Sequence, residues 1–373
     1  MKAASKVSAS PVGKLFIIGF AGTDLSPELA SLLVRMQPAG VILFARNIVQ
    51  AQQTHKLLED CRTRVSEPLF TCVDLEGGRV DRFRGVIGAA PAAQDVFATG
   101  ERKLFRKHGE IIGKSCRALG FNVDLAPVLD LAFPASRRVM SSRSVSIDPK
   151  EVVLYAREFL GGLQAQGVIG AGKHFPGLGE GKLDSHHHLP VIKKTFDRLW
   201  QEDLVPYRIL KRELPMVLVN HASYPSVTRG SSPASLSKKW ITDVLRRSLG
   251  YRGLILSDDL EMGGVLKVAS IGEAAVEFVR AGGDLCLVCH EQEHVENAFE
   301  TMVHEYERKP KFRKRVAESA RRVTDFKRKQ KLARPRPAPS AEMIGQLSRR
   351  LWEFSEQIRF KQLSYATRSL EPR

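Results

Sequence analysis

The sequence lacks the features that would place a chain in a membrane or among disulfide-bonded proteins. It has no apolar run of the roughly 18 residues that a membrane helix needs. Its five cysteines are too few for a disulfide framework in 373 residues. The apolar run at 15–21 is short, is interrupted by Gly19 and is followed by no clear cleavage site, so it predicts a buried strand rather than an export signal. We therefore expect a cytoplasmic protein.

Two short motifs suggest a bound group, and we expect neither to hold one. Cys286-Leu-Val-Cys289-His290 has the spacing of covalent haem attachment, but it overlaps an apolar run typical of a buried strand, where the cysteines would be small hydrophobic residues. His186 begins a tract of three histidines. Neighbouring residues do not easily face one ion, and no cysteine or carboxylate completes a site at the usual ligand spacing. The sequence predicts no metal and no cofactor.

The net charge of +17 is concentrated near the C-terminus. Residues 303–373 contain 20 Lys and Arg against 8 Asp and Glu, which leaves only about +5 for the rest of the chain. The excess thus belongs to a tail and not to a groove across the main domain. We predict no nucleic-acid or membrane partner, although a nucleic-acid-binding protein remains the alternative that the charge favours. We interpret 311–331 as a solvated basic helix, the alternative being contact with an anionic cell component.

Eight short apolar or β-branched runs alternate with stretches of helical spacing, which indicates a parallel sheet covered by helices on both faces. Eight such units favour closure into a (β/α)8 barrel over an open sheet. The helical stretches lie at 51–64, 104–119, 150–166, 196–214, 238–249 and 271–281. The predicted strands are 14–20, 40–45, 69–74, 122–130, 168–175, 216–221, 253–258 and 284–289.

The chain beyond the barrel has a different character. We predict a barrel domain over 1–331, a Pro-rich linker over 332–340 and a basic helical tail over 341–373. The tail helix would dock on the barrel or on a second subunit, so we expect a monomer or a homodimer. Removal of 333–373 is expected to change solubility or assembly more than turnover. The apolar residues that define one face of this helix are Met343, Leu347, Leu351, Phe354 and Ile358.

Polar and ionisable residues gather at five of the predicted strand ends, where barrel enzymes carry their chemistry. Asp258 directly follows an apolar strand, which would hold a nucleophilic carboxylate rigidly, and Asp259 is interpreted as a supporting residue. His221 is either a hydrogen-bonded buried residue or a pocket wall. The groups are Asp74-Leu-Glu76, Asp130, Lys173-His174, Asn220-His221 and Ser257-Asp258-Asp259.

A Gly-rich loop links Lys173 to the pair Asp184 and His186. A carboxylate two residues from an imidazole can fix its tautomer and raise its pKa, which suits a proton donor near neutral pH. The segment 74–82 has two glycines that permit a tight turn and charged groups beside them. Neighbouring carboxylate and guanidinium groups are suited to hydrogen-bonding a sugar ring.

These segments carry a resemblance to a known family. The blocks 74–82, 173–186 with its pattern K-H-F-P-G-x-G-x4-D-S-H, and 257–262 resemble family 3 glycoside hydrolases, in the β-N-acetylglucosaminidase branch. The resemblance extends over about 14–331, and it is specific because several blocks occur in order. One departure is Leu178, which stands where this family usually has His.

The resemblance implies a barrel of the triosephosphate isomerase type and a retaining exo-β-N-acetylglucosaminidase without a cofactor. Asp258 would be the nucleophile, and His186, oriented by Asp184, the acid/base. The implied substrate is a terminal β-linked GlcNAc, as in the peptidoglycan fragments that bacteria recycle. A same-fold β-glucosidase or a phosphorylase is the alternative, and the intact Asp184–His186 pair argues against the glucosidase. The residues that would bind the sugar hydroxyls or acetamido group are Asp74, Arg82, Arg143, Lys173 and His174.

Overall fold

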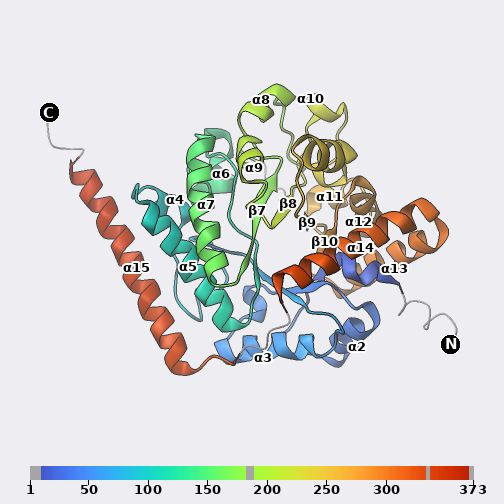
Figure 1. Cartoon of the computed structure of the whole chain (residues 1–373), viewed down its shortest axis with the longest axis horizontal. Coiled ribbons are helices and arrows are strands. Elements are labelled where there is room, and N and C mark those ends of the chain that lie inside the picture. The colour runs from blue at the N-terminus through green and yellow to red at the C-terminus, as the bar shows by residue number, and fades with distance from the viewer. Residues whose placement is uncertain (1–9, 182–188, 333–336, 369–373) are drawn as a thin grey trace.

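The computed structural model describes residues 10–181, 189–332 and 337–368, of which 364–368 are described by their backbone only. Its centre is a closed barrel of parallel strands in the order β1-β10-β9-β8-β7-β6-β3-β2 (Figure 1). The predicted (β/α)8 barrel is confirmed. Seven of the predicted runs each contain one barrel strand, and the run 253–258 matches β9, which extends one residue further. The strands are β1 (Phe16–Ile18), β2 (Gly40–Ile42), β3 (Phe70–Val73), β6 (Val123–Asp124), β7 (Ile169–Phe175), β8 (Met216–Val219), β9 (Leu254–Asp259) and β10 (Leu285–Val288).

The barrel strands are apolar because both of their faces are buried. Alternate residues such as Ile17, Met216 and Leu218 pack together as one cluster, and their neighbours Phe16, Val217 and Val219 pack in the cluster that includes the surrounding helices. At the base, Val323 joins the first cluster and Phe326 packs against it. The carboxyl ends of the strands are thus left as the edge of the barrel where polar side chains gather.

Helices surround the barrel, and their buried residues recur at helical spacing, as Leu104, His108, Ile111 and Ser115 do in α5. The longer ones are α2 (Pro27–Met36), α3 (Ala51–Arg62), α5 (Arg102–Leu119), α7 (Pro149–Ala165), η6 (Lys239–Ser248), α12 (Ile271–Ala281), α13 (Gln292–Arg308), α14 (Pro310–Gln330) and α15 (Ala341–Arg368). The shorter ones are η1 (Pro11–Leu15), η2 (Ala45–Asn47), α4 (Ala93–Phe97), η3 (Pro134–Ser136), α6 (Arg137–Met140), η4 (Ser141–Arg143), α8 (Phe196–Gln201), α9 (Val205–Leu210), α10 (Pro225–Thr228), η5 (Ala234–Leu236) and α11 (Gly263–Leu266).

Two predicted helices differ from the structure. The stretch 196–214 is not one helix but two, α8 and α9, because Glu202 leaves the helical conformation and Pro206 near the start of α9 has no N–H to continue the first helix. The stretch 238–249 forms η6, whose turns have the wider π-helical hydrogen bonding. The apolar spacing indicates these helices, but neither the break between α8 and α9 nor the π-helical bonding of η6.

A two-stranded antiparallel hairpin follows β3 and lies outside the barrel sheet. Its strands are β4 (Leu75–Gly77) and β5 (Val80–Asp81). Gly77 and Gly78 both have positive φ angles, 84° and 59°, which side chains other than glycine adopt at a cost. The tight turn that the sequence predicted at these glycines is present, and it carries the residues on either side of it toward the barrel mouth.

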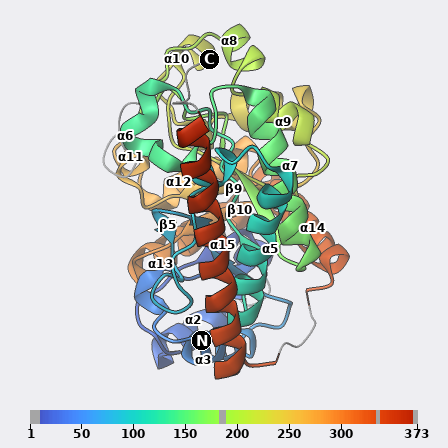
Figure 2. The same cartoon turned by 90° about the vertical axis from the view of Figure 1, so that its left-hand side faces the viewer.

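The C-terminal helix α15 stands along the outside of the barrel beside α5 and α4 (Figures 1 and 2). Four of the five residues predicted to form its apolar face are buried, namely Leu347, Leu351, Phe354 and Ile358. Met343 is the exception, because its side chain is 41% exposed at the start of the helix. Of the two predicted docking partners, the barrel itself covers this face.

Candidate active site

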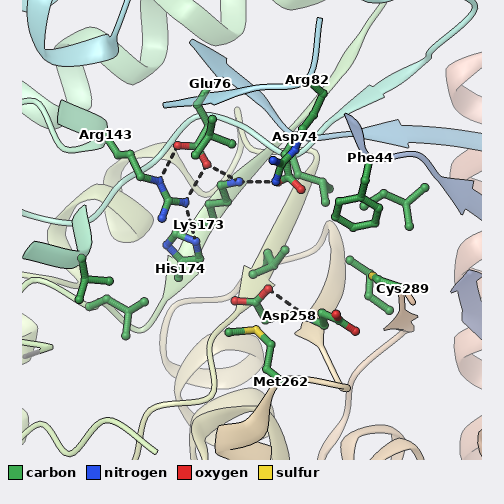
Figure 3. A pocket seen from close by; sticks show the side chains of 18 of the residues that line it. Phe44, Asp74, Glu76, Arg82, Arg143, Lys173, His174, Asp258, Met262 and Cys289 are labelled. Atoms are coloured by element: carbon green, nitrogen blue, oxygen red, sulfur yellow. Dashed lines mark hydrogen bonds and ion pairs between the residues drawn. The ribbon is translucent and has the colours of Figure 1, made fainter. Parts of the chain in front are cut away.

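A pocket opens at the carboxyl ends of the barrel strands, with a cavity volume of about 150 Å³. Phe44, Asp74, Lys173, Asp258 and Cys289 reach it from the ends of five different strands. In Figure 3, Glu76, Arg143, Lys173 and His174 lie on one side, Phe44 and Cys289 lie on the other, and Asp258 lies between these two groups. Of the five predicted strand-end groups, those at Asp74, Lys173 and Asp258 meet in this pocket, whereas Asp130 and Asn220-His221 do not line it.

Glu76 is the centre of an ionic network in the pocket wall. Its carboxylate accepts two hydrogen bonds from Arg143, at 2.7 Å from Nε and 2.8 Å from Nη2, and it lies 2.6 Å from Lys173 Nζ. Burial alone would raise the pKa of Glu76, but the charges and hydrogen bonds of Arg143 and Lys173 outweigh it and hold this pKa well below its ordinary value. Glu76 is therefore an anion that fixes both cations in place.

Asp74 belongs to the same network because it also binds Lys173. Lys173 Nζ donates a 2.7 Å hydrogen bond to Asp74 Oδ1, so one lysine bridges Asp74 and Glu76. Burial would raise the pKa of Asp74, but the charges of Lys173 and Arg82 lower it below its ordinary value. Within the described residues, Arg82 lines the pocket without a hydrogen bond or ion pair to its side chain, and its Nε is buried. Its guanidinium is available to a ligand.

His174 is held between an anion and a cation. Its Nδ1 lies 2.6 Å from Asp130 Oδ2, and its Nε2 lies 3.3 Å from Arg143 Nη2. Because a guanidinium only donates, Nε2 accepts this bond and Nδ1 carries the proton that it donates to Asp130. Asp130 also accepts hydrogen bonds from the backbone N–H of His174 and of Leu178. Asp130, predicted from its strand end, therefore lies behind the pocket wall and orients it.

Asp258 lies at the end of β9 and lines the pocket. Its Oδ1 accepts a 3.0 Å hydrogen bond from the backbone N–H of Asp259. The carboxylate of Asp259 accepts a hydrogen bond from Glu261 N and lies 3.1 Å from His290 Nε2. The carboxylates of Asp258 and Asp259 thus have different surroundings, because Asp259 and not Asp258 lies beside the His290 imidazole.

His221 is a buried residue rather than a pocket wall. Its Nδ1 lies 2.7 Å from Ser235 Oγ, and its Nε2 lies 2.8 Å from the carbonyl oxygen of Asp259, to which it donates. Burial lowers the pKa of His221, which the nearby Asp258 and Asp259 only partly oppose. The sequence left two interpretations of His221. The structure agrees with the one in which it is a hydrogen-bonded buried residue, beneath the end of β9.

The residues Asp184 and His186 lie outside the described part of the chain, as do His187 and His188. The loop that leads to them begins at the pocket, where Leu178 is among the lining residues. Gly177 at the start of this loop has φ 136°, a conformation that favours glycine, and it lies against Asp203. Asp74, Arg82, Arg143, Lys173, His174 and Asp258, the other sequence-predicted site residues, all line this one pocket.

Sequence reasoning missed several residues that shape the pocket. Glu76 was noted only as a strand-end residue, although its place two residues after Asp74 was a usable signal. Phe44 and His290 gave no signal of this kind. Their rings lie 5.2 Å apart on the pocket lining, and Arg46 Nη1 lies 3.1 Å from His290 Nδ1. They come from the ends of β2 and β10, which are far apart in the sequence and adjacent only through β1.

Neither a metal cluster nor a membrane-spanning helix is found among the described residues. In 10–181, 189–332 and 337–368, no three His, Cys, Asp or Glu side chains come together as a metal site would require. No helix in those ranges is long and apolar enough to cross a membrane. The five cysteines are buried and free. Cys286 and Cys289 of the haem-like motif are buried at and beside β10, as small hydrophobic residues would be.

Comparison with known proteins agrees with the geometry of this pocket. Residues 10–326 match the glycosyl hydrolase family 3 N-terminal domain. A β-hexosaminidase of Bordetella avium is 35% identical over 310 residues, 81% of this chain and 87% of the relative. One of Haemophilus influenzae is 35% identical over 319 residues, 84% of this chain and 89% of the relative.

A solved structure of the same family has a similar fold. The family 3 β-N-acetylglucosaminidase of a Paenibacillus species superposes with a TM-score of 0.85 and 30% identity, covering 92% of this chain and 68% of that one. Fold and sequence therefore point to one family over most of the chain. This protein is a glycoside hydrolase that belongs to family 3 and to its β-hexosaminidase branch, as its motifs predict.

Proposed function

We propose that this protein is a retaining exo-β-N-acetylglucosaminidase that removes terminal β-linked GlcNAc. The observation that carries the proposal is the pocket itself, in which the strand-end carboxylate of Asp258 shares one cavity with the ionic wall of Glu76, Arg143, Lys173 and Asp74. A rigid carboxylate suits attack on a sugar carbon, and fixed charged groups suit the recognition of its hydroxyls.

The proposed reaction has two steps. In the first, a carboxylate oxygen of Asp258 bonds to the anomeric carbon while the bond to the leaving oxygen breaks, and that oxygen takes a proton from His186. In the second, a water molecule gives a proton to His186 while the water oxygen bonds to the anomeric carbon. The bond between that carbon and Asp258 breaks, and the carboxylate is released. Two inversions restore the original configuration. Asp184 would orient the His186 imidazole and favour its protonated form.

The ionic wall would bind the sugar before these steps. The Arg82 side chain makes no hydrogen bond or ion pair within the described residues and lies 5.6 Å from the centre of the Phe44 ring, so its guanidinium can donate to a sugar oxygen. Asp74 bonds to Lys173 through Oδ1, which leaves Oδ2 to accept from a hydroxyl. Arg143 and His174 are fixed by Glu76 and Asp130, so they meet the substrate without being reordered. Charged groups that are already held in place need not reorganise when the sugar binds.

The choice of GlcNAc as the sugar rests on the names of the related proteins. The related proteins are described as β-hexosaminidases and a β-N-acetylglucosaminidase. A peptidoglycan-derived fragment as natural substrate and a cytoplasmic location remain predictions from the sequence. An aryl-glycoside panel tests the sugar: aryl β-GlcNAc should be cleaved far faster than aryl β-glucoside, and equal rates would contradict the choice. Release of sugar 1-phosphate in phosphate buffer would instead identify the phosphorylase.

The two catalytic roles separate when the leaving group is varied. Asp258→Ala should lose activity on every substrate, because no glycosyl-enzyme can form. His186→Ala should still be glycosylated by a dinitrophenyl glycoside, whose leaving group departs without protonation, and should lose activity on a disaccharide. Asp184→Asn should lie between the two. Burst and steady-state rates on both substrates measure this.

His187→Ala, which changes the neighbouring histidine, is the matched control for His186→Ala and should keep activity on both substrates. Wild-type hydrolysis of a disaccharide by His186→Ala would place the acid/base elsewhere. A wild-type burst from Asp258→Ala would remove the proposed nucleophile.

A further inference from the structure

The tail helix α15 lies beyond the residues that match the family domain, and it packs tightly on the barrel. Phe354 is completely buried and Leu351 is 4% exposed. Polar contacts along the same face join α15 to the region around α5, since Lys107 Nζ donates to Gln357 Oε1 at 2.8 Å and Lys361 Nζ lies 2.6 Å from Glu101 Oε1. The helix is therefore held in a fixed register against α5 (Figure 2).

One stretch of α15 contacts the loop 82–92, which follows the pocket hairpin. Ser355 Oγ lies 3.3 Å from the carbonyl oxygen of Ala89, and it also lies 2.9 Å from the carbonyl oxygen of Leu351 in its own helix. The Leu351 side chain lies 3.8 Å from the position that a Cβ of Gly88 would occupy. Two successive turns of the helix thus contact two successive residues of the loop.

The same loop is bonded to the turn and to the second strand of the hairpin. The backbone carbonyl of Ala90 accepts a 2.9 Å hydrogen bond from Gly78 N in the turn. The backbone N–H of Ala90 donates a 2.8 Å hydrogen bond to Asp81 Oδ2, and Asp81 Oδ1 accepts a bond from Phe83 N. Ala90 is therefore fixed to the hairpin by both of its backbone groups, one residue away from the contact between Ala89 and α15.

A second route from α15 to the hairpin passes through His108 of α5. The ring of Phe354 lies 5.9 Å from the imidazole of His108, which is completely buried and whose Nδ1 lies 2.9 Å from Tyr155 Oη. On its other side, His108 Nε2 lies 3.2 Å from where a Cβ of Gly77 would be. Phe354, His108 and Gly77 thus form three layers in contact, with the helix outside and the hairpin inside.

The hairpin needs such support because of its size. Two strands of three and two residues have too few hydrogen bonds to hold one conformation by themselves. The hairpin nevertheless carries Glu76, which fixes Arg143 and Lys173 in the pocket, and Arg82 follows directly after its second strand. A small displacement of the hairpin would therefore move several sugar-binding groups together.

We propose that α15 is a part of the active site's support, and that Phe354 and Leu351 are positioning residues that set the sugar-binding wall through His108 and the loop 82–92. The inference rests on the proposed function of the pocket. It also differs from the expectation that the tail affects solubility or assembly more than turnover. Neither residue touches the pocket, so the effect is on the placement of Glu76 and Arg82 and not on the bond-making groups.

The test is Phe354→Ala in the full-length chain, with Trp352→Ala as the matched control on the same helix, where the Trp352 side chain is 65% exposed. Below the unfolding transition, Phe354→Ala should lower kcat/KM for aryl β-GlcNAc by about ten- to a hundredfold, mostly through a higher KM. The pH profile of kcat should stay unchanged, because the acid/base is not affected. Phe354→Leu, which refills most of the space, should recover most of kcat/KM.

Hydrogen exchange supplies a readout that needs no substrate. Amides of 76–92 should exchange faster in Phe354→Ala than in wild type or in Trp352→Ala, while amides of β8 and β9 stay protected. If Phe354→Ala does not fold, Leu351→Ala, which removes the contact at Gly88, carries the same expectations.

Unchanged exchange at 76–92 together with kcat/KM within about twofold of wild type in a folded variant would overturn the proposal. An equal loss in Trp352→Ala would do the same. If wild type does not cleave aryl β-GlcNAc, the proposed function fails, while the exchange experiment still decides whether α15 supports the hairpin.

Discussion

Two buried carboxylates in this barrel bind arginines, and only one of them lines a pocket. Glu76, at the carboxyl ends of the strands, binds Arg143 and Lys173. Asp284, at the amino end of β10, is completely buried and binds Arg246 and Arg322, with Arg315 at 3.6 Å. The chemistry of the two clusters is alike, and their surroundings differ.

The carboxylate of Asp284 is enclosed, although Arg322 of its cluster lines a described pocket that contains none of the predicted site residues. Its Oδ1 also accepts a 3.0 Å hydrogen bond from Ser319, and its Oδ2 accepts one from the backbone N–H of Ile255. Arg315, Ser319 and Arg322 all belong to α14, so the cluster fastens that helix to β9 and β10. Its carboxylate is bonded from several sides, and Asp284 lines none of the described pockets.

The Glu76 cluster is open on one side. Its cations line the pocket, together with Arg82, whose side chain makes no hydrogen bond or ion pair within the described residues. An ionic cluster therefore indicates a site here only because a cavity at the barrel mouth gives a ligand access to it. The comparison leads to three predictions, in order of decreasing effect.

The largest effect is expected from Asp284→Ala. Three arginines would lose their common anion, and an uncompensated buried charge costs about 3–5 kcal/mol of stability. Urea denaturation followed by circular dichroism measures the loss. Asp284→Asn, which keeps an acceptor for Ser319 or Ile255, should lose less. The folded fraction should keep the wild-type kcat/KM, so a tenfold drop in activity with little change in stability would contradict the structural role.

The next effect is expected from Glu76→Gln. Loss of the anion would free Arg143 and Lys173 to move, and we expect kcat/KM for aryl β-GlcNAc to fall about a hundredfold, which is about 2.7 kcal/mol. The matched control is Glu213→Gln, which weakens a half-exposed ion pair with Arg157 away from the pocket and should keep full activity. Equal activity of the two variants would show that the Glu76 cluster is structural like that of Asp284.

The smallest effect, counted per pH unit, concerns His108, a buried ionisable group without a charged partner among the described residues. Burial lowers its pKa from 6.5 to about 3, so the unfolded chain binds a proton that the folded chain does not. Acidification below pH 6.5 should therefore destabilise the fold, by about 1.4 kcal/mol per pH unit from this residue. Urea midpoints at several pH values should fall less steeply for His108→Leu, and equal slopes would refute this origin.

Much of the architecture follows from local pattern. The apolar run at 253–258 gave β9, and the helical spacing at 271–281 gave α12 with the bounds Ile271–Ala281. Such patterns survive because a residue's burial in a barrel strand or helix is set by its position in that element. The break between α8 and α9 was not foreseen, since a proline near a helix start is compatible with either interpretation.

The sequence by itself determined the barrel, the family, and six of the pocket residues, which it predicted as the nucleophile and the sugar-binding groups. Only the tertiary structure decided that Glu76 is the centre of the ionic wall, that Phe44 lies beside His290, and that α15 packs against the support of the hairpin. The reason is physical. Periodicity and strand ends are properties of neighbouring residues, whereas these contacts join segments far apart in the chain, and only barrel closure and packing bring them together.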